Sequence, residues 1–347
     1  GVQTCALPIF IVENGAGEKA FCSNADYEKA GALIKSRSEV VVSSDISLSI
    51  HQPSQSEISS LKSKVIIGVF QPLFNVDEMK QWATSGVTTF SLDMLPRTTR
   101  AQAMDVLSSQ ANIAGYKAVL TAANSYGRYF PMFMTAAGSI APAKVLILGA
   151  GVAGLQAIAT AKRLGAVVEV FDTRPAVKEE VMSLGAKFVE VEGAADASKA
   201  GGYAVEQSED FMQRQKAKIA ESIAKADIVI TTAQIPGKKA PLLITEEMIK
   251  AMRNGSVIID LAAATGGNTP ITKNNETVNY NGVSIIGNSS LQSTMPSDAS
   301  KMYGKNVLNF LQLIITKEGE VNLNWEDDLV KGSCVTHNGE IVHERLK

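Results

Sequence analysis

The sequence predicts an α/β protein with two domains, each a doubly wound parallel sheet, that are joined by long helices. Its 347 residues correspond to two domains at about 150 residues per domain. Between residues 144 and 290, short apolar runs alternate with helical patterns, as expected when helices cover both faces of a parallel sheet. We expect a first domain from residues 1–115 and 298–347, and a second from residues 116–297.

The second domain should contain most of the regular structure. Gly165 and Gly185 mark expected helix ends, and Pro175 marks a helix start. A further helix should end near residue 225, and Thr245 should cap the next one. The expected strands are residues 144–148, 167–171, 187–191, 227–232, 256–261 and 283–287.

The first domain has weaker signals. Its expected elements are helices at 24–32, 74–84 and 298–315, and strands at 40–42, 65–69 and 87–92. The C-terminal tail is polar, so we expect His337 and His343 to be solvated. The first ten residues resemble translated adapter sequence and are given no functional role, and the first domain is expected to be incomplete at its N-terminus.

Composition excludes several classes of function. The formal net charge of −2 and pI near 6.1 argue against a nucleic-acid or anionic-membrane partner. No apolar run approaches the ~18 residues of a membrane-spanning helix. The three cysteines contain no C-x-x-C pair, and the three histidines have no ligand spacing. We therefore expect no metal site, no disulfide framework and a reducing compartment.

A glycine motif points to a dinucleotide. Gly149, Gly151 and Gly154 form G-x-G-x-x-G directly after one strand and at the start of a helix. An acidic residue, Asp172, ends the next strand, 18 residues beyond Gly154. In this βαβ context the glycines allow a tight turn, close approach of a pyrophosphate and close packing of helix on strand. The alternative is a tight turn without a ligand. We expect a Rossmann-like domain.

Asp172 should select the dinucleotide. A carboxylate at the strand end can accept hydrogen bonds from the adenosine ribose of NAD and repels the 2′-phosphate of NADP. Arg174 lies close by and could instead pair with that phosphate. The placement of Asp172 favours NAD.

A long helix with an unusual polar face is expected after Pro96. Thr99 and Gln102 fit a capping box. Apolar residues then recur in steps of three and four, whereas short polar side chains gather on another face. The apolar set is Met104, Leu107, Ala111, Ala114 and Ala118, and the polar set is Gln102, Asp105, Ser108, Ser109 and Asn112.

From about Glu13 to Val342 the chain resembles the NAD(H)-binding component, domain I of the alpha subunit, of proton-translocating NAD(P)+ transhydrogenase. Alanine dehydrogenase shares this architecture. The resemblance rests on residues 96–120, 149–164, 231–241 and 244–261. It implies two Rossmann-like domains, and an Arg-Gln-Asp-Ser set, here Arg97, Gln102, Asp105 and Ser108, at the nicotinamide end of NAD(H). Within that set, Arg97, Gln102 and Asp105 are the expected catalytic residues, and Ser108 is expected to bind cofactor.

The resemblance also implies a mobile loop at Thr231–Pro241 that closes over the nucleotide. Tyr203 matches a tyrosine near the nucleotide, although a packing role fits it equally well. The remaining expected cofactor-binding residues are Gly149, Gly151, Val152, Gly154, Asp172, Thr173, Arg174, Tyr203, Thr232, Ala233, Gln234 and Leu261.

The implied reaction is direct hydride transfer from NADH to NADP+ held on a partner, which needs alignment but no acid or base. The chain should be inactive alone. It should form a homodimer that is cytoplasmic and peripheral to the inner membrane through NADP(H)-binding and membrane components, without inserting into the membrane itself.

Two alternatives remain open. An alanine-dehydrogenase-like enzyme would need a lysine near Phe70 and a histidine, but no histidine lies between His51 and His337. A non-catalytic NAD-binding protein is the other. The chain departs from the family pattern at residues 260–267, where an acid before the two glycines is missing, and at residues 288–296.

Overall fold

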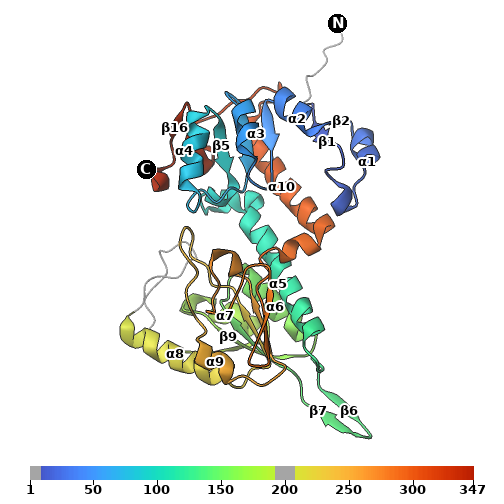
Figure 1. The fold of residues 1–347 in the computed structure, drawn as a ribbon, viewed down its shortest axis with the longest axis vertical. Coiled ribbons are helices and arrows are strands. Elements are labelled where there is room, and N and C mark those ends of the chain that lie inside the picture. The colour runs from blue at the N-terminus through green and yellow to red at the C-terminus, as the bar shows by residue number, and fades with distance from the viewer. Residues whose placement is uncertain (1–8, 192–207) are drawn as a thin grey trace. The chain divides into compact units, whose positions relative to one another are not determined.

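The computed structural model describes residues 9–191 and 208–347, so the expected site residue Tyr203 lies outside the described residues. The chain forms two compact units, Gly1–Gln110 with Met295–Lys347, and Ala111–Thr294. The chain crosses between them inside helix α5 (Val106–Ser125) and just before helix α10 (Pro296–Ile314) (Figure 1).

The second unit contains a seven-stranded sheet with the order β10-β9-β8-β11-β12-β14-β13. All strands are parallel except β13, which runs antiparallel to β14. The chain builds outward from β8 in one direction and then from β11 in the other, so a topological switch point lies between β8 and β11. The strands are β8 (Lys144–Leu148), β9 (Val167–Phe171), β10 (Lys187–Phe188), β11 (Ile228–Thr231), β12 (Val257–Asp260), β13 (Thr277–Tyr280) and β14 (Val283–Ile286).

Helices cover both faces of this sheet, which confirms the predicted doubly wound α/β arrangement. Alternate residues of β8 enter different cores: Val145 and Ile147 pack with α5, α6 and α7, whereas Leu146 and Leu148 pack with α8 and α9. Among the described residues of this unit, the helices that follow α5 are α6 (Val152–Arg163), α7 (Lys178–Ser183), α8 (Glu209–Ile223) and α9 (Glu246–Lys250).

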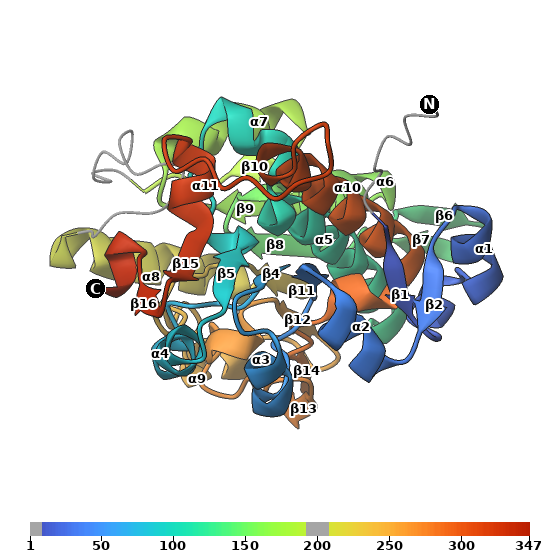
Figure 2. The ribbon, with the colours of Figure 1, turned by 90° about the horizontal axis from the view of Figure 1, so that it is seen from above.

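The first unit is organised around a five-stranded sheet with the order β16-β15-β5-β4-β3. Figure 2 shows β16, β15, β5 and β4 in this order. Strands β3, β4 and β5 are parallel, and β4 contributes Val65 and Ile67 to a core with α10 and α11, and Ile66 to a core with α2, α3 and α4. The strands are β3 (Ile46–Leu48), β4 (Val65–Gly68), β5 (Thr88–Ser91), β15 (Cys334–His337) and β16 (Glu340–Ile341). The helices are α1 (Asn24–Lys29), α2 (Arg37–Ser43), α3 (Gln55–Ser60), α4 (Val76–Thr84), α10 and α11 (Asp328–Ser333).

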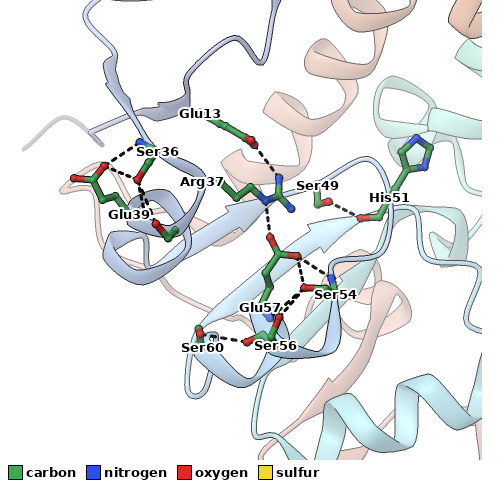
Figure 3. Close-up of polar contacts among 11 residues, drawn as sticks. Glu13, Ser36, Arg37, Glu39, Ser49, His51, Ser54, Ser56, Glu57 and Ser60 are labelled. Carbon is green, nitrogen blue, oxygen red and sulfur yellow. Dashed lines mark hydrogen bonds and ion pairs between the residues drawn. The ribbon is translucent and has the colours of Figure 1, made fainter.

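The strand predicted at residues 40–42 is wrong: these residues belong to helix α2. Ser36 caps the helix, because its hydroxyl and backbone N–H both bond the Glu39 carboxylate, while the Glu39 amide donates to the hydroxyl. Arg37 in the first turn bonds Glu13 of β1 (Ile11–Glu13) and Glu57 of α3 (Figure 3). The Arg37 guanidinium lowers the pKa of Glu57 to about 2. These local contacts override the β preference of Val40–Val42.

The C-terminal tail is not the solvated segment that its polarity suggested. Strand β15 pairs antiparallel with β5, and Val335 is fully buried. His343 is 9% exposed and contacts the Gly332 carbonyl at 3.1 Å, and burial lowers its pKa. His337 stacks on Trp325 with ring centroids 4.5 Å apart. The expected solvated position is therefore wrong for His343, while His337 is half-buried, because the tail completes the sheet edge.

Two small sheets were not anticipated. Strand β1 pairs parallel with β2 (Leu33–Lys35), and β6 (Phe133–Thr135) forms a hairpin with β7 (Gly138–Ile140). Over the residues described, no helix combines the length and apolarity needed to cross a membrane.

Candidate functional site

The glycine turn connects β8 to α6 in the second unit. Gly149 has φ +108°, and a Cβ placed on it would lie 2.3 Å from the Thr232 hydroxyl oxygen. A Cβ on Gly154 would lie 1.9 Å from the Gly149 carbonyl oxygen, whereas a Cβ on Gly151 meets no atom within 4 Å. Two of the glycines therefore permit the turn itself, and Gly151 faces open space.

Gly151 is also the N-cap residue of α6, and it supplies no side chain to cap the helix. The first backbone N–H groups of a helix have no partners within the helix, and they carry the positive end of its dipole. Val152, which is 40% exposed, begins the first turn. The sequence thus creates a place where a phosphate group can approach exposed amides without meeting a side chain at Gly151.

Asp172 lies at the end of β9, beside the glycine turn. Its Oδ2 accepts a hydrogen bond of 2.7 Å from the Ala150 amide. Arg174 donates three hydrogen bonds to the same carboxylate, from its backbone N–H at 2.8 Å, its Nε at 2.9 Å and its Nη2 at 2.7 Å. This pairing raises the pKa of Arg174. Both groups are largely buried, with side chains 18% exposed for Arg174 and 6% for Asp172. Thr173 between them is half-buried.

The segment that follows β11 reaches the glycine turn from the other side. The Thr232 hydroxyl donates to the Gly149 carbonyl at 3.2 Å, and Gln234 Nε2 donates to the Leu261 carbonyl at 2.8 Å. The Leu261 amide in turn donates to the Thr231 carbonyl. Thr232, Ala233 and Leu261 are half-buried and Gln234 is exposed. These expected cofactor residues therefore surround the carboxyl ends of β8, β11 and β12, where parallel sheets bind ligands.

Two polar residues at this edge were missed by the sequence analysis. Asp260, which ends β12, and Asn268 are both fully buried. The backbone N–H of Asn268 donates to Asp260 Oδ2 at 2.7 Å. Asp260 could have been found, because it lies at the carboxyl end of β12 as Asp172 lies just after β9. Asn268 has no local signal, because its partners are distant in sequence.

The Arg-Gln-Asp-Ser set lies in the first unit, around the start of α5. Arg97 and Gln102 are exposed, and residues Thr99–Met104 form a 3-10 helix. The α-helix begins only at Val106, where Asp105 Oδ1 accepts from the Ser108 amide at 2.9 Å and Oδ2 from the Ser108 hydroxyl at 2.6 Å. The predicted capping box of Thr99 and Gln102 is wrong, because Asp105 performs this role.

The buried face of α5 also differs from the predicted stripe. Leu107 is 40% exposed, whereas Ser109 is buried and donates to Asn306 Oδ1 at 2.7 Å. A serine can occupy this buried face because α10 offers an amide partner.

A different face of α5 reaches α6 within the second unit. Asn112 Nδ2 lies 3.3 Å from Gln156 Oε1, and a Cβ on Gly115 would lie 2.1 Å from the Ala153 carbonyl oxygen. Both contacts join α5 to the N-terminal half of α6 inside the second unit.

The described residues contain no group of three side chains that could hold a metal ion. The arrangement offers instead backbone amides, a carboxylate beside them, and a loop that borders both. These are the groups from which proteins build dinucleotide sites.

Comparisons with known proteins agree with this interpretation. Residues 9–114 match the alanine dehydrogenase/PNT N-terminal domain, and residues 118–344 match the C-terminal domain of the same family. The chain is 44% identical over 346 residues to an NAD(P) transhydrogenase alpha-subunit polypeptide of Rhodospirillum rubrum, covering 97% of this chain and 90% of that protein.

Solved structures show the same fold. A transhydrogenase from Sinorhizobium meliloti superimposes with a TM-score of 0.87 at 44% identity, covering 96% of this chain and 91% of that one. An L-alanine dehydrogenase gives a TM-score of 0.80 at 22% identity, with 97% and 89% coverage, and shares the fold.

Proposed function

The chain belongs to the alanine dehydrogenase/PNT family, and we propose that it is the NAD(H)-binding component of a proton-translocating NAD(P)+ transhydrogenase. The observation that carries the proposal is the glycine turn. Gly151 provides no side chain to cap the first amides of α6, the space around it is open, and Asp172 lies beside the turn. This geometry suits a pyrophosphate followed by a ribose with free hydroxyls.

We assign roles to the expected residues accordingly. The amides of α6 hold the pyrophosphate, and Asp172 accepts from the adenosine ribose. Because Arg174 already pairs with Asp172, its charge is engaged by a carboxylate, which favours NAD over NADP. Arg97, Gln102, Asp105 and Ser108 orient the nicotinamide end.

When bound, the nicotinamide of NAD(H) would donate a hydride directly to a second nicotinamide, or accept one from it in the reverse reaction. The chain's own residues then need only to align the ring and exclude water, which accounts for a site built without an acid–base pair. The loop at Thr231–Pro241, with its exposed residues around Gly237, is suited to cover the nucleotide.

The proposed reaction requires partners. NADP(H) is held by a separate component, a membrane component conducts the protons, and this chain is cytoplasmic and peripheral to the inner membrane through both. A homodimer is supported by the β6–β7 hairpin and the residues just before it. Met132 and Met134 are 65% and 76% exposed, and the Tyr129 ring lies tilted against Phe133 with centroids 4.7 Å apart. An isolated hairpin is marginally stable in water, so a second copy is expected to cover it.

The geometry disfavours the alanine-dehydrogenase alternative. Phe70 stands near the position where that enzyme would need its lysine, and its side chain is 1% exposed and packs edge-on against Trp82 at 5.1 Å. The backbone amide of Phe70 donates to the Ser91 hydroxyl at 2.9 Å. An apolar ring held in this way cannot bind a keto acid. A non-catalytic NAD-binding protein remains the alternative that activity measurements decide.

Reconstitution tests the proposal. We expect the purified chain to be inactive alone and to support reduction of NADP+ by NADH when mixed with the partner components of a related transhydrogenase. Asp105→Asn should lower that rate at least about tenfold at unchanged thermal stability, because asparagine still caps α5 but removes the charge.

Asp77→Asn, at an exposed position of the same unit, is the matched control and should keep full activity. Failure of the wild-type chain to support the reaction, although it binds NADH, would favour the non-catalytic alternative.

A further inference from the structure

The loop between β11 and α9 is fastened at both ends by one side chain. Asn268 Nδ2 donates to the Ala233 carbonyl at 2.9 Å and to the Pro241 carbonyl at 2.8 Å. The two hydrogens of the amide are therefore both used. Asn268 Oδ1 is buried and has no hydrogen-bond partner among the described residues. The orientation of the amide follows from this, because the reverse orientation would place its oxygen against two carbonyl oxygens.

Asn268 is itself held rigidly. It is fully buried, its backbone N–H donates to Asp260 Oδ2 at 2.7 Å, and its carbonyl accepts from the amides of Leu243 and Ile244, both at 3.0 Å. Asp260 is fixed in turn by the Ala262 amide at 2.9 Å and the Thr272 hydroxyl at 2.6 Å. One residue thus links the end of β12, both ends of the loop and the approach to α9.

Between the two fastened carbonyls, residues 234–239 are less constrained, whereas Ala240 is buried and donates its amide to the Thr265 carbonyl at 2.9 Å. Residues 234–236, 238 and 239 are exposed, and Ile235 is 42% exposed. The segment folds on itself in a short turn at Gly237, which has φ +73°, with the Lys238 amide donating to the Ile235 carbonyl. Few buried contacts and an exposed backbone are the features of a segment that opens at low free-energy cost.

We propose that Asn268 is a positioning residue that places the hinges of this loop at Ala233 and Pro241, so that only the intervening segment moves. The same bond keeps Ala233, and with it Thr232, against the carbonyl of Gly149. Loss of the two amide hydrogen bonds should therefore loosen the loop and the wall of the glycine turn together. The consequence for NAD(H) affinity rests on the proposed function, whereas the fastening of the loop does not.

Limited proteolysis of the full chain without nucleotide tests the fastening. Trypsin cuts after lysine, and Lys238 and Lys239 are both exposed in the loop. Asn268→Asp is isosteric but removes the amide donors and faces two carbonyl oxygens. We expect its cleavage after these lysines to be at least about tenfold faster than in the wild type, with other sites unchanged. Asn274→Asp, which adds the same charge at an exposed turn, should be cut at the wild-type rate.

Asn268→Ala removes the donors without adding charge, and it decides the question if the aspartate variant does not fold. Hydrogen exchange of the wild type provides a measurement without mutation: the Leu243 and Ile244 amides should be protected, and those of Gln234, Ile235 and Gly237 should exchange rapidly. Unchanged cleavage in a folded Asn268 variant, or equal protection on both sides of Pro241, would overturn the proposal.

Kinetic measurements, together with titration of the wild type with NADH, separate this inference from the proposed function. With NADH, the folded variants should show a raised KM in the reconstituted reaction and a smaller change in kcat. Faster cleavage in a protein whose wild type binds no NADH would support the hinge while removing the proposed function.

Discussion

Gly151→Ala should leave the protein folded and weaken NADH binding at least about tenfold, the change expected for about 1.4 kcal/mol. A Cβ at this position would meet no atom within 4 Å, so the added methyl group should not change the stability of the fold. A pyrophosphate resting on the α6 amides would occupy that space. The measurements are calorimetric titration with NADH and thermal unfolding followed by circular dichroism.

Gly154→Ala should behave differently, because its Cβ would lie 1.9 Å from the Gly149 carbonyl oxygen. The helix must move away from the strand, which we expect to cost about 3 kcal/mol or more, at the upper end of overpacking penalties. Gly127→Ala is the control in the same unit, since its Cβ meets no atom within 4 Å. If Gly151→Ala bound NADH as the wild type does, the phosphate site could not be where we place it.

Replacing Asp172 by alanine should reverse the preference between the two dinucleotides. The variant loses the ribose acceptor, so NADH affinity should fall at least about tenfold. It also removes the negative charge that repels a 2′-phosphate beside the Arg174 guanidinium, so NADPH should bind more tightly than it does to the wild type.

Two controls make this experiment specific. Glu169→Ala removes a carboxylate from the same strand, where it pairs with Lys187 near the surface, and should change neither affinity. Adding Arg174→Ala to the Asp172 variant should abolish the gain for NADPH. Equal loss of NADH and NADPH in the single variant would show that Asp172 acts through the shape of the turn and does not discriminate between the nucleotides.

The second unit could be predicted closely because its signals are local. Most of its strands are short runs of apolar residues, and Gly165 and Gly185 end the helices where expected, both with positive φ. Strand β13, in which polar and apolar residues alternate, was not predicted. In the first unit, β4, β5, α4 and α10 were predicted, but the strand at the C-terminal edge of the sheet was not, since long-range pairing decides it. Strand β15 forms because it pairs with β5, more than 240 residues away. The polar sequence around β15 contains no signal of that pairing.

The candidate site divides in the same way. The glycine turn is a local motif with a mechanical reason for each glycine, so its position was predictable. The start of α5 was misplaced because Thr99 and Asp105 both offer capping groups, and only the folded chain selects Asp105. Asn268 was invisible, because its side chain bonds carbonyls 35 and 27 residues away.

The most direct test of the account is calorimetric titration of the purified chain with NADH, with NADPH measured alongside. We expect NADH to bind in the micromolar range and NADPH at least about tenfold more weakly, as a charge mismatch of ~1.4 kcal/mol at Asp172 would produce. Binding of neither dinucleotide, or tighter binding of NADPH, would contradict the assignment of this chain as the NAD(H)-binding component.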